Sequence, residues 1–138
     1  MIVLDTNIVS VLMTPDHPDA AIIEAWLLTS GQQDLCTTAV TQAEILYGLA
    51  YLPDGARKRR MTEAAEQFFV NAVTLSFDAQ AARHYATLVS RRRTQGRPIG
   101  VLDAQIAAIA LAAGGTVATR NVRDFADCGV PVVNPYEP

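Results

Sequence analysis

Four acidic residues stand within or directly after apolar stretches of this sequence: Asp5, Glu44, Asp103 and Asp124. Asp5 follows the apolar run MIVL, and Asp103 interrupts the segment GVLDAQIAAIALAAGG, which is otherwise almost free of polar side chains. An ionised carboxylate removed from water costs several kcal/mol unless something compensates its charge. Because little basic sequence lies nearby, a shared divalent cation is the simplest compensation, and these positions predict a metal site.

The residue types around the four acids indicate which metal and which chemistry. Oxygen ligands without histidine or cysteine nearby favour Mg²⁺ or Mn²⁺ over zinc. Without a cation, three or four converging carboxylates would repel one another, and at least one would become neutral. A bound divalent ion can activate water for phosphodiester hydrolysis without a protein nucleophile. The sequence contains no credible serine or cysteine triad and no glycine-rich phosphate loop.

Each acid also has a purely structural interpretation. Asp5 could cap a helix that begins at residue 6. Glu44 stands three residues after Thr41, which is the spacing of a capping box. Asp103 could interact favourably with a helix dipole, and Asp124 could be a surface acid on a turn. Asp103 fits its structural interpretation least well, because a helix that is apolar on all sides is buried and no basic residue lies within one turn of it.

Short β-rich runs alternate with longer helical patterns along the chain. Strands are expected at 2–5, 35–37, 73–75, 116–119 and 130–133, and helices at 6–13, 19–29, 41–52, 56–70, 78–94 and 101–113, with a helical turn at 122–126. This alternation predicts an α/β fold with a central twisted parallel sheet of four to five short strands flanked by helices. Ligands in such folds bind beyond the carboxyl ends of the strands, where we expect the four acids to converge.

Composition favours one compact domain over residues 1–138. Half of the residues are hydrophobic and 18% are charged, which argues against disorder. No apolar run reaches membrane-spanning length, and the opening MIVLD lacks the basic start of a signal peptide. We therefore predict a cytoplasmic protein, in which Cys36 and Cys128 are reduced core thiols.

The basic residues are few but clustered. The net charge of −3 argues weakly against nucleic-acid binding. Ten of the eleven basic residues are arginine, and eight of the eleven lie at 57–60 and 91–93 or at Arg97 close by. Guanidinium groups match phosphate geometry, but both clusters could equally be solvated helix faces, and the second would complement a helix C-terminus.

Four sequence blocks resemble one family of proteins. They are IVLDTNIVS, TTAVTQAEILYGL, IGVLDAQIAAIAL and TVATRNVRDF, the last followed by a final strand and NPYEP. In this order and spacing the chain resembles the PIN-domain ribonucleases, specifically the VapC and FitB-like toxins of toxin–antitoxin pairs. The resemblance covers the whole chain and implies the PIN fold.

The resemblance also implies roles for particular residues. Asp5, Glu44, Asp103 and Asp124 match the family's acidic quartet, which holds one or two Mg²⁺ or Mn²⁺ ions, and Asp5 and Asp103 match its most dependable ligands. A polar shell that orients water and ligands is matched by Thr6, Asn7, Thr119 and Asn121. The implied activity is endonucleolytic cleavage of RNA. The implied partners are a small antitoxin encoded beside the toxin and a second copy of the chain.

RNA has to be held beside the acids as well as cleaved. Arg120 and Arg123 flank Asn121 and Asp124 in the sequence and are the first candidates for phosphate contact. Two alternatives stay open at this point. The protein could be a metal-dependent nuclease that is not a toxin and acts on DNA or in RNA processing, or an inactive PIN domain that only binds a partner.

Overall fold

The computed structural model describes residues 1–31 and 33–138. Its centre is a parallel sheet of five strands in the order β3-β2-β1-β4-β5. The strands are β1 (Ile2–Leu4), β2 (Leu35–Thr38), β3 (Val73–Leu75), β4 (Thr116–Ala118) and β5 (Val132–Val133). The predicted parallel sheet is therefore confirmed, with each strand within one or two residues of its expected place.

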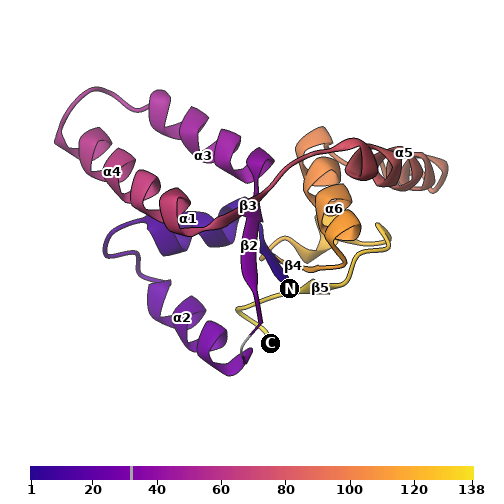
Figure 1. Cartoon of the computed structure of the whole chain (residues 1–138), viewed down its shortest axis with the longest axis horizontal. Coiled ribbons are helices and arrows are strands. Elements are labelled where there is room, and N and C mark those ends of the chain that lie inside the picture. Colours follow the sequence, from indigo (N-terminus) through magenta and orange to yellow (C-terminus); the bar gives the residue numbers. More distant parts are fainter. Residues whose placement is uncertain (32) are drawn as a thin grey trace.

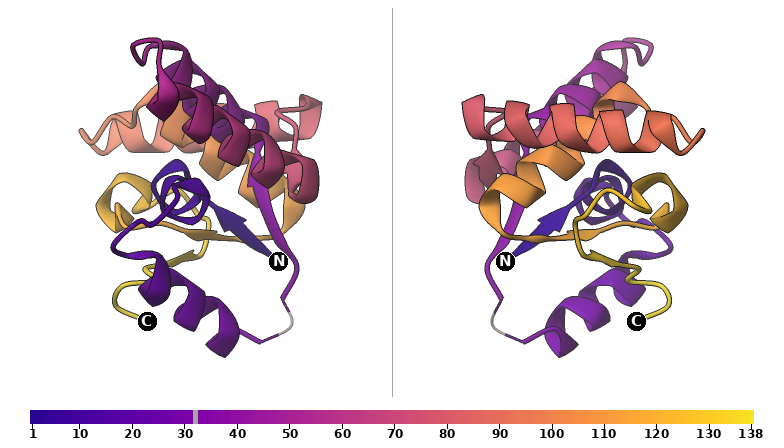
Figure 2. Two further views of the ribbon diagram at one scale, coloured as in Figure 1. Left: turned by 90° about the vertical axis from the view of Figure 1, so that its left-hand side faces the viewer. Right: turned by 90° about the vertical axis from the view of Figure 1, so that its right-hand side faces the viewer.

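The helices form a layer on each face of the sheet. They are α1 (Thr6–Met13), α2 (Ala20–Thr29), α3 (Ala39–Ala50), α4 (Ala56–Asn71), α5 (Ala79–Thr94) and α6 (Val101–Ala113), with the short 3₁₀ helix η1 at Val122–Phe125. Helices α1 to α4 lie to one side of the sheet and the α5–α6 pair to the other (Figure 1). The side views separate these layers, with α3 and α4 toward the viewer on the left and α5 on the right (Figure 2).

The first strand shows why the sheet needs helices on both faces. Ile2 and Leu4 pack in the apolar cluster formed with α1 to α4, whereas Val3 between them packs in the cluster formed with α5 and α6. Successive side chains of a strand point to opposite faces, so a strand that is apolar throughout must be covered twice. The sequence MIVL thus specifies a central strand.

The order of the strands places a topological switch point beside β1. From β1 the chain continues to β2 and β3 on one side, and it returns through α6 to β4 on the other side. Leu4 at the end of β1 pairs with Ala118 at the end of β4. Parallel sheets bind ligands outside the carboxyl ends of strands at such a point, and Asp5 and Thr119 are the residues that follow these two strand ends.

Two helices begin with an aspartate cap. Asp5 is the N-cap of α1, since its Oδ1 accepts a hydrogen bond from the Thr6 N–H. Asp78 caps α5, because its Oδ1 accepts from the Ala81 N–H at 2.9 Å. Asp5 lies one residue beyond β1 rather than within it, so its structural interpretation as a cap is correct and does not compete with a second role.

The start of α3 differs from the prediction. Thr38, not Thr41, is the N-cap, and its Oγ1 accepts from the Thr41 N–H at 3.0 Å. The strand β2 passes into α3 without a loop, so Thr38 ends the strand in an extended conformation and caps the helix. Glu44 therefore lies in the second turn of α3, too far along for a capping box with Thr41.

Helix α6 ends as predicted but is less buried than predicted. Gly114 adopts the left-handed conformation with φ of +66° and ends the helix, as glycine does at this position in many helices. Its first turn stands out from the core, because Val101 is 59% exposed and Leu102 is 46% exposed. The expectation of a helix buried on all sides is wrong for this turn, in which Asp103 is half-buried.

Two further expectations concern the cysteines and membranes. Cys36 and Cys128 are both buried and free, as predicted for core thiols. Within the described ranges, no helix has both the length and the apolarity needed to cross a bilayer.

Candidate active site

Asp5 is held at the centre of the sheet's carboxyl edge by three hydrogen bonds. Its side chain is 4% exposed. Oδ1 accepts from the Thr6 N–H at 2.7 Å, and Oδ2 accepts from Asn7 Nδ2 at 2.9 Å and from the Thr119 hydroxyl at 2.7 Å. These donors come from α1 and from the end of β4, so the carboxylate is fixed at the switch point.

Thr119 and Asn7 extend this network toward the next loop. Thr119 Oγ1 accepts from Asn7 Nδ2 at 3.1 Å and from the Asn121 N–H at 3.0 Å. Asn7 Oδ1 accepts from the Arg120 N–H at 3.1 Å. The structure thus brings together all four residues expected in the polar shell, namely Thr6, Asn7, Thr119 and Asn121, although Asn121 contributes through its backbone.

Glu44 reaches the same edge from the second turn of α3. The Thr6 hydroxyl donates a 2.7 Å hydrogen bond to Glu44 Oε1. The hydroxyl of Thr41, which is fully buried, lies 3.2 Å from the same Thr6 oxygen. Glu44 is therefore oriented by α1 and not by its own helix, which explains why a capping interpretation from local spacing was wrong.

Asp103 is the acid whose pKa is affected by all three of the others. Burial raises its pKa to about 6, and the neighbouring carboxylates of Asp5, Asp124 and Glu44 add to this increase. Burial also raises the pKa of Asp5, with a smaller contribution from Glu44, while its hydrogen bonds to Thr119, Thr6 and Asn7 act in the opposite direction. Asp5 follows the end of β1, Asp124 lies in η1 after β4, and Thr6 beside Asp5 binds Glu44. Because Asp103 is close enough to all three for their charges to raise its pKa, the four acids lie at this edge of the sheet.

Asp124 is placed differently from the expectation of four buried acids. It lies in the first turn of η1 and is exposed, whereas the next residue, Phe125, is buried. In a four-residue 3₁₀ turn at the surface, one side chain enters the core and its neighbour faces solvent. Only Asp5 is fully buried, while Glu44 and Asp103 are half-buried.

The four acids do not form a closed set of ligands. Within residues 1–31 and 33–138, no group of three or more His, Cys, Asp or Glu side chains is arranged so that it could already hold a metal ion. The donors nevertheless fit a hard divalent cation, because all are carboxylate oxygens, and burial together with the nearby charges of the other three acids raises the pKa of Asp103. Side-chain rotations would have to draw the carboxylates together around such an ion.

A hollow of about 500 Å³ adjoins Asp124. The Arg120 guanidinium lies 4.7 Å from the centre of the Tyr136 ring, and the Tyr136 hydroxyl donates to Asp19 Oδ2 at 3.1 Å. Arg120 is thereby held at the wall of the hollow. The hollow is lined by Arg120, Asn121, Val122, Arg123, Asp124, Asn134, Tyr136 and Glu137.

The arginines within a cluster can differ in exposure to solvent. Arg57, Arg59 and Arg60 are exposed on α4, as are Arg91 and Arg93 on α5. Arg92 is only 5% exposed, so the expectation of a solvated face or a phosphate contact is wrong for this residue. A signal for its burial was present, because Arg92 follows Leu88 by four residues and Ala81 by eleven and so lies on their apolar face of α5.

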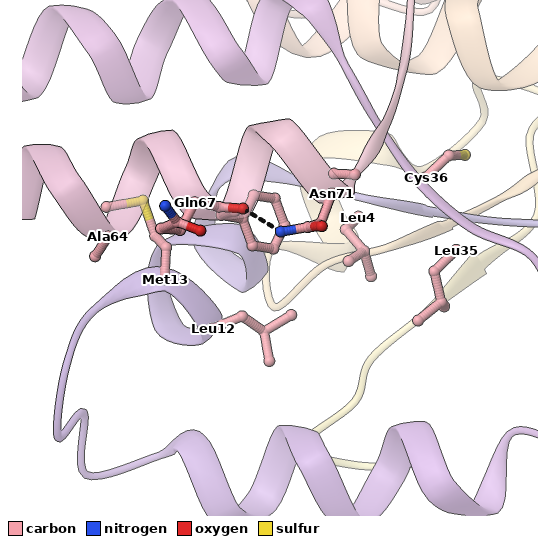
Figure 3. A pocket seen from close by; sticks show the side chains of 10 residues that line it. Leu4, Leu12, Met13, Leu35, Cys36, Ala64, Gln67 and Asn71 are labelled. Carbon is pink, nitrogen blue, oxygen red and sulfur yellow. Dashed lines mark hydrogen bonds between the residues drawn. The ribbon is translucent and has the colours of Figure 1, made fainter.

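A second hollow, of about 440 Å³, lies away from the acids. It opens between α1, α4 and the strands β1 and β2, with Leu12 and Met13 facing Ala64 and Gln67 of α4 (Figure 3). None of the four carboxylates lines it. Its lining is mainly apolar, which suits side chains of a protein better than a phosphodiester.

The fold and the acidic edge define a PIN domain, and the PIN domain family model matches residues 2–130. The chain belongs to this family and, within it, to the VapC and FitB-like ribonuclease toxins. It is 40% identical to "VapC ribonuclease Y4jK" of Sinorhizobium fredii, covering 100% of this chain and 99% of the relative. It is 34% identical to the "tRNA(fMet)-specific endonuclease VapC" of Shigella flexneri, covering 91% and 90%. The crystal structure of FitAcB from Neisseria gonorrhoeae superposes with a TM-score of 0.87 at 35% identity, covering 100% of both chains.

Proposed function

We propose that this protein is an endoribonuclease, the toxin of a VapBC-like toxin–antitoxin pair, and that it hydrolyses RNA phosphodiester bonds at the acidic edge with Mg²⁺ or Mn²⁺. One observation carries the proposal. Four carboxylates share one edge at the switch point of the sheet, and three of them contribute to the raised pKa of the fourth, Asp103. A domain that only bound a partner would gain nothing from this repulsion.

Asp5 and Asp103 are the proposed principal metal ligands, with Glu44 and Asp124 completing the site directly or through water. When bound, the metal would supply an activated water and stabilise the charge that develops on the phosphate. The chain's own residues orient the ligands. Thr6, Asn7 and Thr119 fix both oxygens of Asp5, and hydrogen-bonded partners of this kind keep ligands in place for binding.

RNA would be held next to the acids by the hollow beside Asp124. Arg120 and Arg123 line it, and stacking on Tyr136 keeps the Arg120 guanidinium in a defined position. Arginine binds phosphate through paired N–H donors. We therefore expect the backbone of a single RNA strand to pass from this hollow across Asp124 to Asp103.

The proposed protein partner is the antitoxin of the pair. This chain is similar to chains of the solved FitAB and VapBC-1 structures. The apolar hollow between α1 and α4 (Figure 3) would receive apolar side chains of the antitoxin without covering residues that we assign to catalysis. A homodimer and a cytoplasmic location remain part of the proposal.

Substitution of Asp5 or Asp103 by asparagine tests the catalytic assignment. Each change keeps the side chain's size but removes a charge, so RNA cleavage with Mg²⁺ or Mn²⁺ should be lost while the circular dichroism spectrum is retained. Asp16→Asn is the matched control, because Asp16 is exposed in the loop between α1 and α2. This variant should cleave RNA normally. Full activity of either test variant would refute the mechanism.

Two observations would separate a toxin from a nuclease of another kind. Expression of the wild-type chain should arrest growth, and co-expression of the short protein encoded beside it should restore growth. Sequencing of the RNA ends made in total RNA, compared with the Asp5→Asn variant, identifies the substrate. Products from DNA but not RNA would favour the non-toxin alternative.

A further inference from the structure

Arg92 is a buried cation near the acidic edge whose role the proposed mechanism leaves unexplained. It lies in the last turn of α5 and is 5% exposed. Within the described residues no carboxylate forms an ion pair with it. A buried charge is costly without compensation, so the groups that surround this guanidinium indicate what it does.

The guanidinium is compensated by backbone carbonyls from two different segments. Its Nε donates to the Arg97 carbonyl at 2.6 Å, and its Nη1 donates to the carbonyls of Asp124 at 3.0 Å and Ala126 at 2.8 Å. The sulfur of Cys128 lies 3.6 Å from Nη1. Arg92 therefore joins the end of α5 to the segment that begins with η1.

The segment held in this way carries Asp124, whose own element is weak. Helices of the 3₁₀ type have poor hydrogen-bond geometry and are short, and η1 has only four residues. Phe125 anchors it in the core on one side, and Arg92 anchors its carbonyls on the other. The Asp124 N–H also donates to the Asn121 carbonyl at 3.0 Å, so both backbone polar groups of this residue are engaged.

We propose that Arg92 is a positioning residue that fixes the backbone of Asp124 and thereby keeps this exposed carboxylate at the metal edge. The inference rests on the proposed function. The Asp124 side chain is exposed, so its place depends on the backbone and not on packing around the carboxylate. Errors of about 1 Å in such a group matter, since catalytic geometry tolerates little displacement.

Only arginine supplies this set of contacts. Its planar fork presents several N–H donors in fixed directions, whereas lysine offers a single ammonium group. Arg92→Lys keeps the charge but cannot reach the Arg97, Asp124 and Ala126 carbonyls together. Arg92→Gln keeps part of the length and removes the charge, and it serves as the second variant.

The test measures Mn²⁺ binding to the RNA-free protein by calorimetry, together with kcat and KM for RNA cleavage. Arg92→Lys should weaken Mn²⁺ binding by about 10-fold or more, as loss of residues that orient ligands typically does, and should lower kcat with little change in KM. Arg83→Lys, exposed on the same helix, is the control and should match the wild type. Arg92→Gln should lose at least as much Mn²⁺ affinity and kcat as Arg92→Lys.

A double-mutant comparison distinguishes positioning from a general structural role. If Arg92 acts through Asp124, Arg92→Lys should cause no further loss of Mn²⁺ affinity in an Asp124→Asn background. Additive losses, unchanged Mn²⁺ affinity in both Arg92 variants, or unfolding of both at the assay temperature would overturn the proposal. Failure of the wild type to bind Mn²⁺ and to cleave RNA would instead refute the proposed function.

Discussion

The hydroxyl of Thr119, just after β4, donates a 2.7 Å hydrogen bond to Oδ2 of Asp5, just after β1. This bond spans the switch point of the sheet, between residues 114 positions apart in the chain. It lowers the pKa of Asp5 against the opposing effect of burial. The geometry of the sheet thus helps to keep the buried carboxylate ionised, which is the form that binds a cation.

Thr119→Val should shift the activity toward higher pH. Valine keeps the shape of threonine but removes the hydrogen-bond donor, so the pKa of Asp5 rises and a larger fraction of Asp5 is protonated at low pH. The acidic limb of the pH–rate profile should therefore move to higher pH. Thr116→Val, at the other end of β4, is the control. Superimposable profiles for wild type and Thr119→Val would contradict this assignment.

The metal-free protein should lose stability as the pH rises between 3.8 and about 6. The folded-state pKa of Asp103 is raised above its ordinary value of 3.8 to about 6, so the folded state binds this proton more tightly than the unfolded state does. The free energy of unfolding must then fall across this window. Urea unfolding at several pH values should give a steeper fall for wild type than for Asp103→Asn, and equal slopes would exclude Asp103 as the cause.

Mg²⁺ or Mn²⁺ should counter this loss mainly at the upper end of the same window. A ligand that binds only the folded state raises the melting temperature, and it requires ionised carboxylates. We expect a larger thermal shift above pH 6 than near pH 4. Asp103→Asn should show little shift at either pH, whereas an equal shift in this variant would place the ion elsewhere.

Arg123→Gln should weaken RNA binding in a salt-dependent manner. Arg123 lines the hollow beside Asp124, and a lost phosphate contact reduces the slope of log K against log[salt] by about one unit. Arg83→Gln, on the exposed face of α5, should leave the slope unchanged. The measurement is best made with the inactive Asp5→Asn protein so that the RNA stays intact. An unchanged slope would remove Arg123 from the RNA site.

Ala64→Arg should release the antitoxin without affecting catalysis. Ala64 lines the apolar hollow (Figure 3), and a long charged side chain there would fill the space needed by an apolar anchor. Loss of such an anchor costs on the order of 2 kcal/mol, which is more than tenfold in Kd. Ala86→Arg is the control, because Ala86 lies at an exposed position of α5. Retained antitoxin binding by Ala64→Arg would exclude the hollow as the docking surface.

The order of elements and the candidate acids could be read from the sequence because they depend on local patterns. The apolar run MIVL indicates a strand, and the expected limits of the helices at 78–94 and 101–113 agree with the structure to within one residue. The spacing of Asp5, Glu44, Asp103 and Asp124 needed no coordinates either, since each follows or interrupts a recognisable element. Each of these features depends on residues that are close together in the sequence.

Tertiary structure alone decided how exposed each acid is and what holds it. Whether Asp124 faces solvent depends on η1, which Arg92 anchors from a segment about 30 residues earlier. The orientation of Glu44 depends on Thr6 from another helix, and local spacing suggested the wrong partner. Such contacts join residues far apart in sequence, so they follow from strand order and packing. The sequence by itself determined which carboxylates could meet. The fold decided that Asp5 is buried, that Asp103 lies near the negative charges of the other three acids, and that Asp124 stays exposed.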